Sequence, residues 1–284
     1  MSTLQDFKRP GSVAEAVAMM REGPGKGGFI AGGTSLGMAR MLPYDYLVDI
    51  TGIGLNEIRR DGDLVHIGAT ATVQQLATSP IVQTPGLGFL AQAALSVATR
   101  QIRNMATVGG DLVSGYPVAD LPAAFLVLDA QLGLAGSHRE KLSLQDFLNS
   151  GAFQGLNGGL VTKVTFRVPP SDSRGIFVKF ARTENDVALL DLACLARLNG
   201  GQFEEVRVAL GSTVPHPLRL TAVEEFLQGK PAQEKIVAQA AELATKDLSL
   251  LDNIRGSRAY RMKMVQVLLH RVLLTCAQRG GGDR

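Results

Sequence analysis

Two short segments of the chain combine adjacent glycines with hydroxyl side chains, a pattern suited to a phosphate-bearing ligand. Glycines permit positive φ angles and close approach of the backbone, so successive N–H groups can converge on an anion while the hydroxyls add donors. The same pattern also occurs as an ordinary tight turn. The residues are Ala31, Gly32, Gly33, Thr34, Ser35 and Leu36 in the first segment, and Thr107, Val108, Gly109, Gly110 and Asp111 in the second.

Asp120 follows the second segment at the start of a predicted helix that carries Pro122 in its first turn. A carboxylate at this place can accept hydrogen bonds from ribose or ribityl hydroxyls. The alternative is that Asp120 only caps its helix. Two glycine segments and a carboxylate downstream together suit a ligand with two phosphates and polyol arms.

A third glycine cluster, residues 23–28, spells GxGxxG but does not have the context of a dinucleotide fingerprint. Such a fingerprint follows a strand and opens a helix, so that the helix N-terminus faces the pyrophosphate. Here the helix comes first and the strand second, and Pro24 removes one N–H donor. We expect a surface turn.

The elements that must position these residues indicate an α+β fold. Ser12 and Glu15 form a predicted capping box at the start of the first helix, and Thr221 and Glu224 suggest a second one. Short strands and helices alternate up to the polar connector at residues 169–175, our predicted domain boundary. Long strands followed by a run of helices complete the chain, which favours α+β over a strictly alternating fold.

The last predicted helix combines an apolar stripe with basic residues. The spacing of three and four residues predicts one buried face, and the basic residues Arg258, Arg261 and Arg271 are expected on a more exposed face. The stripe consists of Met262, Val265, Leu269, Val272 and Cys276.

Composition excludes several classes of site. The two cysteines, Cys194 and Cys276, cannot supply the four ligands of an ordinary iron-sulfur cluster, and we expect both to be buried apolar residues. The four histidines show no ligand spacing, so we assign no metal to the chain. With no apolar run long enough for a bilayer and no signal-like start, the expected location is the cytoplasm.

The formal net charge of +3 is unevenly distributed. Residues 252–284 hold seven Lys or Arg and two Asp, a net +5, so residues 1–251 sum to 3 − 5 = −2. The basic excess is local and indicates a solvated helix face or a docking surface. Aromatic residues are only 5% of the chain and no nucleic-acid reader motif occurs, so we expect no nucleic-acid partner.

Five segments in the same order and spacing resemble the FAD-binding subunits of the xanthine dehydrogenase and carbon monoxide dehydrogenase family, the molybdenum hydroxylases. The resemblance extends from about residue 4 to residue 278. No single segment is decisive, but the ordered set is specific. The segments are AGGTSL, QIRNMATVGGDL, DLPAAFLVLDA, KFARTENDVA and VALGSTVPHPLR.

This resemblance implies an FAD-binding domain of the vanillyl-alcohol oxidase (PCMH) type, built from two α+β subdomains, and a C-terminal domain of antiparallel sheet and helices. We expect the first domain at residues 1–170, with subdomains at about 1–52 and 53–170, and the second at 175–280. By the same resemblance, the two glycine segments would hold the pyrophosphate and neighbouring groups of a non-covalent FAD. Asp120 would contact the ribose side.

The resemblance also assigns roles close to the flavin ring. Lys179 would lie near the isoalloxazine with Arg182 and Asp186 close by, and the strand around Val161 would offer backbone contacts. Without the resemblance, Lys179 on a strand would be an ordinary surface charge. The chain departs from the family at Asp111, where Asn is usual, and at Tyr116-Pro117, where Asp-Pro is usual.

In the implied function this chain has no catalytic residue for the organic substrate. It would take electrons from [2Fe-2S] clusters of a small partner subunit and pass them to NAD, oxygen or a quinone. A large partner subunit would hold the molybdopterin cofactor, in a dimer of heterotrimers. The alternatives are a self-sufficient flavoprotein oxidase and a scaffold subunit that has lost FAD. The substrate and the final acceptor stay open.

Overall fold

The computed structural model describes residues 4–38, 44–115, 118–150, 156 and 158–278. The chain forms two compact units that interleave along the sequence. The N-terminal unit comprises residues 1–79, 99–116 and 129–167, and the C-terminal unit comprises residues 80–98, 117–128 and 168–284. Two stretches that the sequence places within its first domain, residues 80–98 and 117–128, thus belong to the C-terminal unit. The limits 1–170 and 175–280 remain a proposal about sequence domains.

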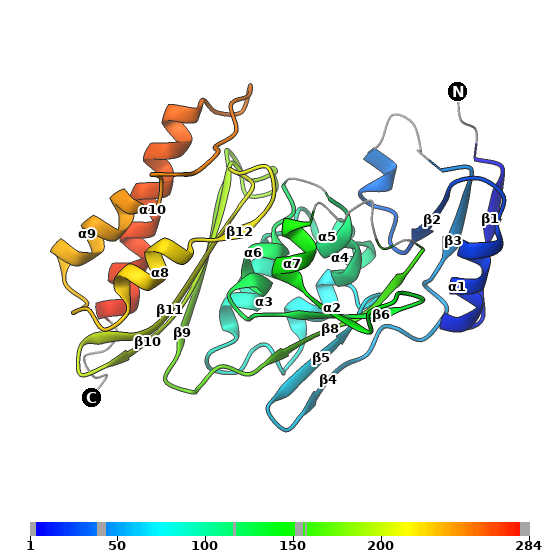
Figure 1. Cartoon of the computed structure of the whole chain (residues 1–284), viewed down its shortest axis with the longest axis horizontal. Coiled ribbons are helices and arrows are strands. Elements are labelled where there is room, and N and C mark those ends of the chain that lie inside the picture. The colour runs from blue at the N-terminus through cyan, green and yellow to red at the C-terminus, as the bar shows by residue number, and fades with distance from the viewer. Residues whose placement is uncertain (1–3, 39–43, 116–117, 151–155, 157, 279–284) are drawn as a thin grey trace. The chain divides into compact units, whose positions relative to one another are not determined.

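The N-terminal unit begins with a three-stranded parallel sheet in the order β1-β3-β2, which α1 accompanies (Figure 1). These elements are β1 (Asp6–Lys8), α1 (Val13–Glu22), β2 (Gly27–Ile30) and β3 (Tyr46–Asp49). The Ser12 side chain accepts a hydrogen bond from the Glu15 N–H, as the capping box predicts. In a capping box the Glu15 carboxylate would accept from the N–H of Ser12. Here it accepts from the N–H of Gly11 instead.

A five-stranded antiparallel sheet, in the order β4-β5-β8-β6-β7, forms the rest of this unit with short helices. The strands are β4 (Ile58–Asp61), β5 (Leu64–Gly68), β6 (Gln131–Ala135), β7 (Lys141–Ser143) and β8 (Leu160–Arg167). The helices are η1 (Leu36–Met38), α2 (Val73–Thr78), α4 (Arg100–Met105), α5 (Val108–Val113) and α7 (Leu144–Asn149). Residues 23–26 of the third glycine cluster form the turn between α1 and β2, as expected, whereas Gly27 and Gly28 already belong to β2.

The C-terminal unit is built on an antiparallel sheet in the order β12-β11-β10-β9, with helices on both faces (Figure 1). The strands are β9 (Arg174–Phe180), β10 (Leu190–Asn199), β11 (Gln202–Gly211) and β12 (Leu218–Arg219). On one face lie α8 (Thr221–Leu227), α9 (Glu234–Leu243) and α10 (Arg258–Gln278). On the other lie α3 (Gly88–Ser96) and α6 (Leu121–Leu126). This arrangement confirms the predicted sheet-and-helix domain.

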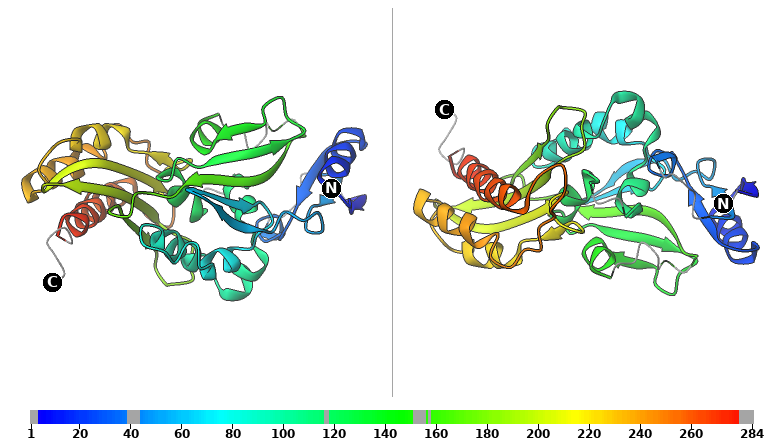
Figure 2. Two further views of the ribbon diagram at one scale, coloured as in Figure 1. Left: turned by 90° about the horizontal axis from the view of Figure 1, so that it is seen from below. Right: turned by 90° about the horizontal axis from the view of Figure 1, so that it is seen from above.

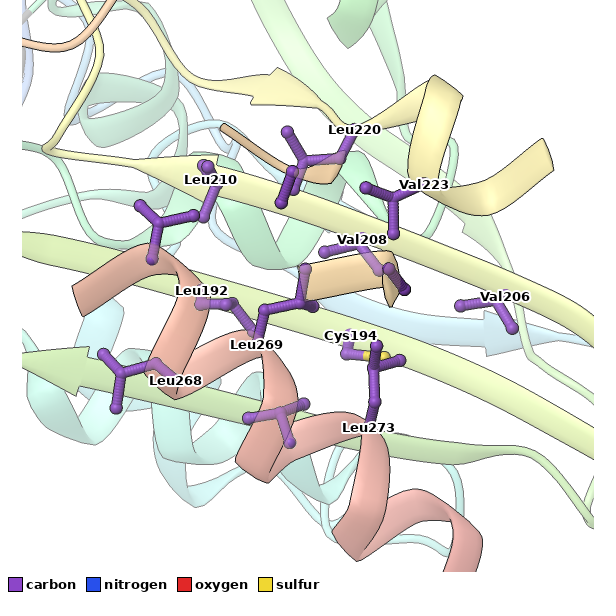
Figure 3. Packing of buried hydrophobic residues seen from close by; sticks show 14 of the residues in the cluster. Leu192, Cys194, Val206, Val208, Leu210, Leu220, Val223, Leu268, Leu269 and Leu273 are labelled. Atoms are coloured by element: carbon purple, nitrogen blue, oxygen red, sulfur yellow. The ribbon is translucent and has the colours of Figure 1, made fainter. Parts of the chain in front are cut away.

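The core of this unit is where α10 packs along the sheet, as the two views in Figure 2 show. Leu269 and Leu273 of α10 lie against Leu192 and Cys194 of β10 (Figure 3). Both cysteines are free and buried, as expected. A hydrogen bond with the Cys276 thiol and burial hold the pKa of the Cys194 thiol well above its usual range, so Cys194 stays an inert thiol.

The predicted stripe on α10 is confirmed at four positions and wrong at its first. Val265, Leu269, Val272 and Cys276 are buried, whereas 38% of Met262 is exposed. The buried position four residues before Val265 is occupied by Arg261. None of the helices within the described part of the chain is long and apolar enough to cross a membrane.

The expectation that Arg261 is exposed is therefore wrong, although Arg258 and Arg271 are exposed. Arg261 is 2% exposed, and its Nη1 donates to the carbonyl oxygens of Leu189 and Ser212. These carbonyls stand where β10 begins and β11 has ended, and buried acceptors need donors. The guanidinium supplies them, which no periodic pattern in the sequence indicates.

The predicted cap of α8 is also wrong. The helix begins at Thr221, with Leu220 in the N-cap position and no side-chain capping bond. Glu224 instead accepts hydrogen bonds from the Arg219 guanidinium and from the backbone N–H of Val208. The carboxylate joins the helix to β11 and β12, a tertiary role that outweighs the local capping pattern.

Candidate functional site

The first glycine segment leaves β2 through a turn that requires glycine at two positions. Gly33 has a φ of +68°, in the left-handed region that residues with a Cβ rarely adopt. A Cβ on Gly32 would lie 1.8 Å from the carbonyl oxygen of Met105 at the end of α4. The segment therefore turns sharply while its backbone touches the residue that ends α4.

Several hydrogen-bond donors in this turn have no partner among the described residues. Within the described part of the chain, no hydrogen bond uses the backbone N–H of Gly32, Gly33, Thr34 or Ser35, or the hydroxyl of either side chain. The Gly33 carbonyl accepts from the N–H of Gly37 at 2.8 Å, which holds the turn closed. Successive unspent N–H groups beside two hydroxyls are the donor set that binds a phosphate.

The second glycine segment is not the turn that the sequence suggests. Thr107 is the N-cap of α5, and Gly109 and Gly110 both lie in the first helical turn. Neither glycine has a positive φ. Our expectation that Gly110 needs the left-handed region is wrong, because a helix begins there.

The backbone donors of this second segment are already used within the chain. The N–H groups of residues 108 and 109 donate to the carbonyl oxygens of Ala71 and Ala69, and those of residues 110 and 111 donate to the Thr107 hydroxyl and carbonyl oxygens. These four N–H groups are thus bonded within the protein in this structure. The hydroxyl proton of Thr107 is still able to donate, although the side chain is only 5% exposed.

Gly109 serves close packing. A Cβ there would lie 2.7 Å from both the Cβ and the carbonyl oxygen of Ala69. The N–H of Ala69 in turn donates to the Thr162 carbonyl on β8 at 2.9 Å, next to the buried Val161. Within the N-terminal unit the structure thus ties α5 to β8, while Gly32 touches the end of α4, the helix just before α5.

In the C-terminal unit the structure brings Asp120 and Lys179 together. Lys179 Nζ donates to Asp120 Oδ2 at 3.2 Å and to the carbonyl oxygen of Ser96 at 2.8 Å. Their side chains are 8% and 7% exposed, so Lys179 is a buried cation and not a surface charge. Asp120 stands at the N-cap position of α6 but makes no side-chain capping bond, so the alternative that it merely caps its helix is wrong.

A third ionisable group, Asp191 on β10, completes this cluster and was missed by the sequence analysis. Asp191 is fully buried and is the cross-strand partner of Lys179 on β9. The Ser212 hydroxyl donates to Asp191 Oδ2. A lone acid in the apolar run LLDLACLA was the signal that could have revealed it.

Burial dominates the electrostatics of both acids. It raises the pKa of Asp120 to about 6, although the Lys179 charge and hydrogen bond pull in the opposite direction. It also raises the pKa of Asp191 well above the usual range, and the neighbouring Asp120 charge adds to the effect. In both acids of this cluster, burial thus favours the neutral carboxyl group.

Arg182 and Asp186 form a separate pair in the connection between β9 and β10, with 2.8 Å between Arg182 Nη2 and Asp186 Oδ2. The hydrogen bond from Arg182 lowers the pKa of Asp186. The Arg182 side chain is 68% exposed. Tyr116 and Pro117 lie outside the described residues. No group of three or more potential metal ligands occurs among the residues that are described.

Comparison with known proteins identifies the family. Residues 3–169 match the FAD binding domain in molybdopterin dehydrogenase, and residues 176–276 match the CO dehydrogenase flavoprotein C-terminal domain. The chain belongs to the FAD-binding subunits of the molybdenum hydroxylases. The resemblance drawn from the five segments is thus confirmed, as is the α+β FAD-binding domain followed by a domain of antiparallel sheet and helices.

Similar proteins cover nearly the whole chain. The carbon monoxide dehydrogenase medium chain of Hydrogenophaga pseudoflava is 31% identical over 94% of this chain and 95% of its own. The putative xanthine dehydrogenase FAD-binding subunit of Escherichia coli K12 is 27% identical over 99% of each chain. The structure of quinoline 2-oxidoreductase from Pseudomonas putida 86 superposes with a TM-score of 0.90 at 29% identity, covering 98% of this chain and 99% of that one. This molybdenum hydroxylase chain is an oxidoreductase subunit with an FAD-binding domain.

Proposed function

We propose that this chain binds one FAD non-covalently and relays electrons from [2Fe-2S] clusters of a small partner subunit to NAD, oxygen or a quinone. The observation that carries the proposal is the set of unspent donors at Gly32, Gly33, Thr34 and Ser35, inside a domain whose family binds FAD. FAD exchanges either one or two electrons, so when bound it can connect one-electron clusters to a two-electron acceptor.

In the N-terminal unit, the proposal assigns residues 31–36 to the pyrophosphate. Four N–H groups and two hydroxyls supply donors for the oxygens of a diphosphate, and the positive φ of Gly33 gives the backbone its turn at this place. Thr107 supplies one hydroxyl and Asp111 a carboxylate for a sugar or ribityl hydroxyl. Gly109 and Gly110 contribute by letting the chain pack closely at this place, and Val161 by its backbone.

In the C-terminal unit, the proposal assigns Asp120 to a ribose hydroxyl and Lys179 to the flavin side. The Lys179 ammonium has three N–H donors, of which two go to Ser96 and Asp120. The third is available to a ligand. The pair is electrically balanced, so it orients polar groups of a ligand without adding net charge. No residue of this chain is assigned to the organic substrate.

The proposed partners follow from the names of the relatives. A medium chain of carbon monoxide dehydrogenase implies a small and a large chain beside it. We propose a small iron-sulfur subunit, a large subunit with the molybdopterin cofactor, and a dimer of these heterotrimers, in the cytoplasm. The substrate belongs to the large subunit, and relatives acting on carbon monoxide, xanthine and quinoline leave several classes open.

Acid precipitation of the purified chain tests the non-covalent site. We expect one FAD per chain, all of it in the supernatant, because neither glycine segment carries a His, Cys or Tyr anchor. Gly33→Val should empty the site, since a branched side chain opposes a φ of +68°. Gly37→Val is the matched control, because a Cβ there meets no atom of the described residues within 4 Å.

The outcomes separate the alternatives. Flavin that stays with the precipitate would indicate a self-sufficient oxidase with covalent FAD, and a purified chain without flavin bands would indicate a scaffold. Full flavin occupancy in Gly33→Val would remove the first segment from the site. The relay itself is tested by turnover, since we expect the isolated chain to oxidise no substrate and the complex lacking it to reduce no final acceptor.

A further inference from the structure

The cluster around Asp191 joins three strands and two helices of the C-terminal unit at one buried point. Asp191 stands on β10, opposite Lys179 on β9 and next to the end of β11, where Ser212 follows Gly211. Lys179 reaches Asp120 ahead of α6 and Ser96 at the end of α3. The side chains of Asp120, Lys179, Asp191 and Ser212 are each at least nine-tenths buried. Ser96 contributes only its backbone carbonyl.

Each acid in the cluster has one oxygen with a partner and one without. Asp120 Oδ2 accepts from Lys179, and Asp191 Oδ2 accepts from Ser212. Their Oδ1 atoms are both buried, and no N–H or O–H of the described residues reaches either one. The two carboxyl groups lie close enough that each shifts the pKa of the other, and Lys179 is the cation that bonds to one of them. Two buried anions beside a single cation are costly, so one acid of the pair carries a proton.

The position of the cation decides which acid that is. The Lys179 ammonium bonds directly to Asp120, which favours the ionised form there. Asp191 has only the Ser212 hydroxyl, and a buried carboxylate without a cation is costly. The other charged group nearby, Arg261 of α10, donates to the carbonyls of Leu189 and Ser212 and not to Asp191.

We propose that Asp191 is a positioning residue of the flavin site that acts as a neutral carboxylic acid, donating a hydrogen bond to Asp120 and thereby holding Asp120 and Lys179 as a balanced ion pair. The inference rests on the proposed function, in which Asp120 and Lys179 contact FAD. A neutral Asp191 adds no third charge beside Asp120 and Lys179, so the third N–H of the Lys179 ammonium stays available to the ligand.

The proposal predicts two separate pH limits. As pH falls through about 6, Asp120 gains a proton and loses its pairing with Lys179, so FAD affinity falls by up to about tenfold per pH unit. At alkaline pH Asp191 loses its proton, two anions share one cation, and affinity falls again. In Asp191→Asn the amide keeps both hydrogen bonds but cannot ionise, so the alkaline fall disappears and the acid fall remains.

Folding stability must move in the opposite sense on the acid side. The pKa of Asp120 is raised in the folded chain, so its contribution to the free energy of unfolding is complete below about pH 4 and is lost as pH rises through about 6. For Asp191 the same loss continues to higher pH. We therefore expect Asp191→Asn to flatten only the upper part of the stability profile. A merely structural role would shift the whole profile without changing its shape.

Infrared spectroscopy with ¹³C-labelled aspartate gives the decisive measurement. Its first result comes from the wild-type chain and does not depend on whether any variant folds. At pH 7.5 we expect one buried protonated carboxyl band, absent in Asp191→Asn. It should also be absent in Asp120→Asn, where Lys179 becomes free to ionise Asp191. Asp186→Asn on the same hairpin is the matched control, because Asp186 is an ionised partner of Arg182, and this variant should keep the band.

The results separate this inference from the proposed function. A wild-type spectrum without a protonated carboxyl band, or a band that survives in Asp191→Asn, overturns the role of Asp191. A chain with the band but without any FAD contradicts the proposed function and leaves the neutral acid established. FAD titrations from pH 5 to 9 complete the test, and an alkaline fall that persists in Asp191→Asn rejects the coupling to the flavin site.

Discussion

The two glycine segments are similar in sequence but differ in backbone conformation and in hydrogen bonding. In residues 31–36 the backbone turns at Gly33, which has a positive φ. The N–H groups of residues 32–35 have no hydrogen-bond partner in the described part of the chain. In residues 107–111 the chain enters a helix, and the N–H groups of residues 108–111 are all bonded within the protein. A pair of glycines therefore identifies a ligand loop only when the donors around it have no other partner.

Glycine is needed for a different reason in each segment. At Gly33 the gain is a backbone conformation, whereas at Gly109 it is space, because α5 would otherwise collide with Ala69. Substitutions in the first segment should act mainly on FAD, and substitutions in the second mainly on folding.

Gly32→Ala should be the most damaging single methyl group in either segment. Its Cβ would lie 1.8 Å from the Met105 carbonyl oxygen, a backbone atom that cannot move without α4. We expect FAD affinity to fall at least about tenfold, or ~1.4 kcal/mol, and the free energy of unfolding to fall by about 1–3 kcal/mol. Flavin titration and urea unfolding measure the two effects. Gly37→Ala, whose Cβ meets no atom within 4 Å among the residues that the structure describes, should match wild type in both.

Gly109→Ala should lower stability without a comparable effect on FAD. The added Cβ meets the Ala69 backbone at 2.7 Å, so we expect the free energy of unfolding to fall by about 1–3 kcal/mol. Affinity for FAD, measured on the folded fraction, should stay within about threefold, below ~1 kcal/mol. A variant that unfolds like wild type but binds no FAD would show that this segment contacts the cofactor after all.

Thr34→Ala and Thr107→Ala form a crossed pair. Thr107 caps α5, so its replacement should cost about 1 kcal/mol of unfolding free energy, and Thr107→Ser should restore most of it. Thr34 bonds to nothing in the described part of the chain, so its replacement should change stability by less than about 0.5 kcal/mol. It should weaken FAD binding instead. Equal effects of both variants on stability would contradict the division.

Asp111→Asn should have the smallest effect. Asn supplies an equivalent oxygen to a hydroxyl of the cofactor, so we expect FAD affinity to stay within a few-fold of wild type. Asp111 lies in the first turn of α5, where a negative charge is favourable, so stability should fall by about 0.3–1 kcal/mol. Calorimetric titration with FAD measures the first effect. A large gain in affinity would mean that the carboxylate lies close to a phosphate and repels it.

Much of the architecture could be predicted from local patterns. Residue patterns predict strands at 160–169, 186–198 and 203–213, and β8, β10 and β11 overlap these three segments. The Ser12 cap and the buried positions from Val265 to Cys276 were also correct, because each depends on residues within a few positions of one another. The order of five family segments was enough to identify the family.

Tertiary contacts decided the rest, because they join residues that are far apart in the chain. The carbonyl oxygens of Ala71 and Ala69 accept the N–H groups of Val108 and Gly109, where the second glycine segment enters a helix. Arg261 is buried since two carbonyls at strand ends need its donors. Asp120, Lys179 and Asp191 form one cluster across three elements, where burial raises the pKa of both acids and the Lys179 ammonium bonds to Asp120 alone of the two. Sequence alone determined which groups were available; the fold determined their charge and their partners.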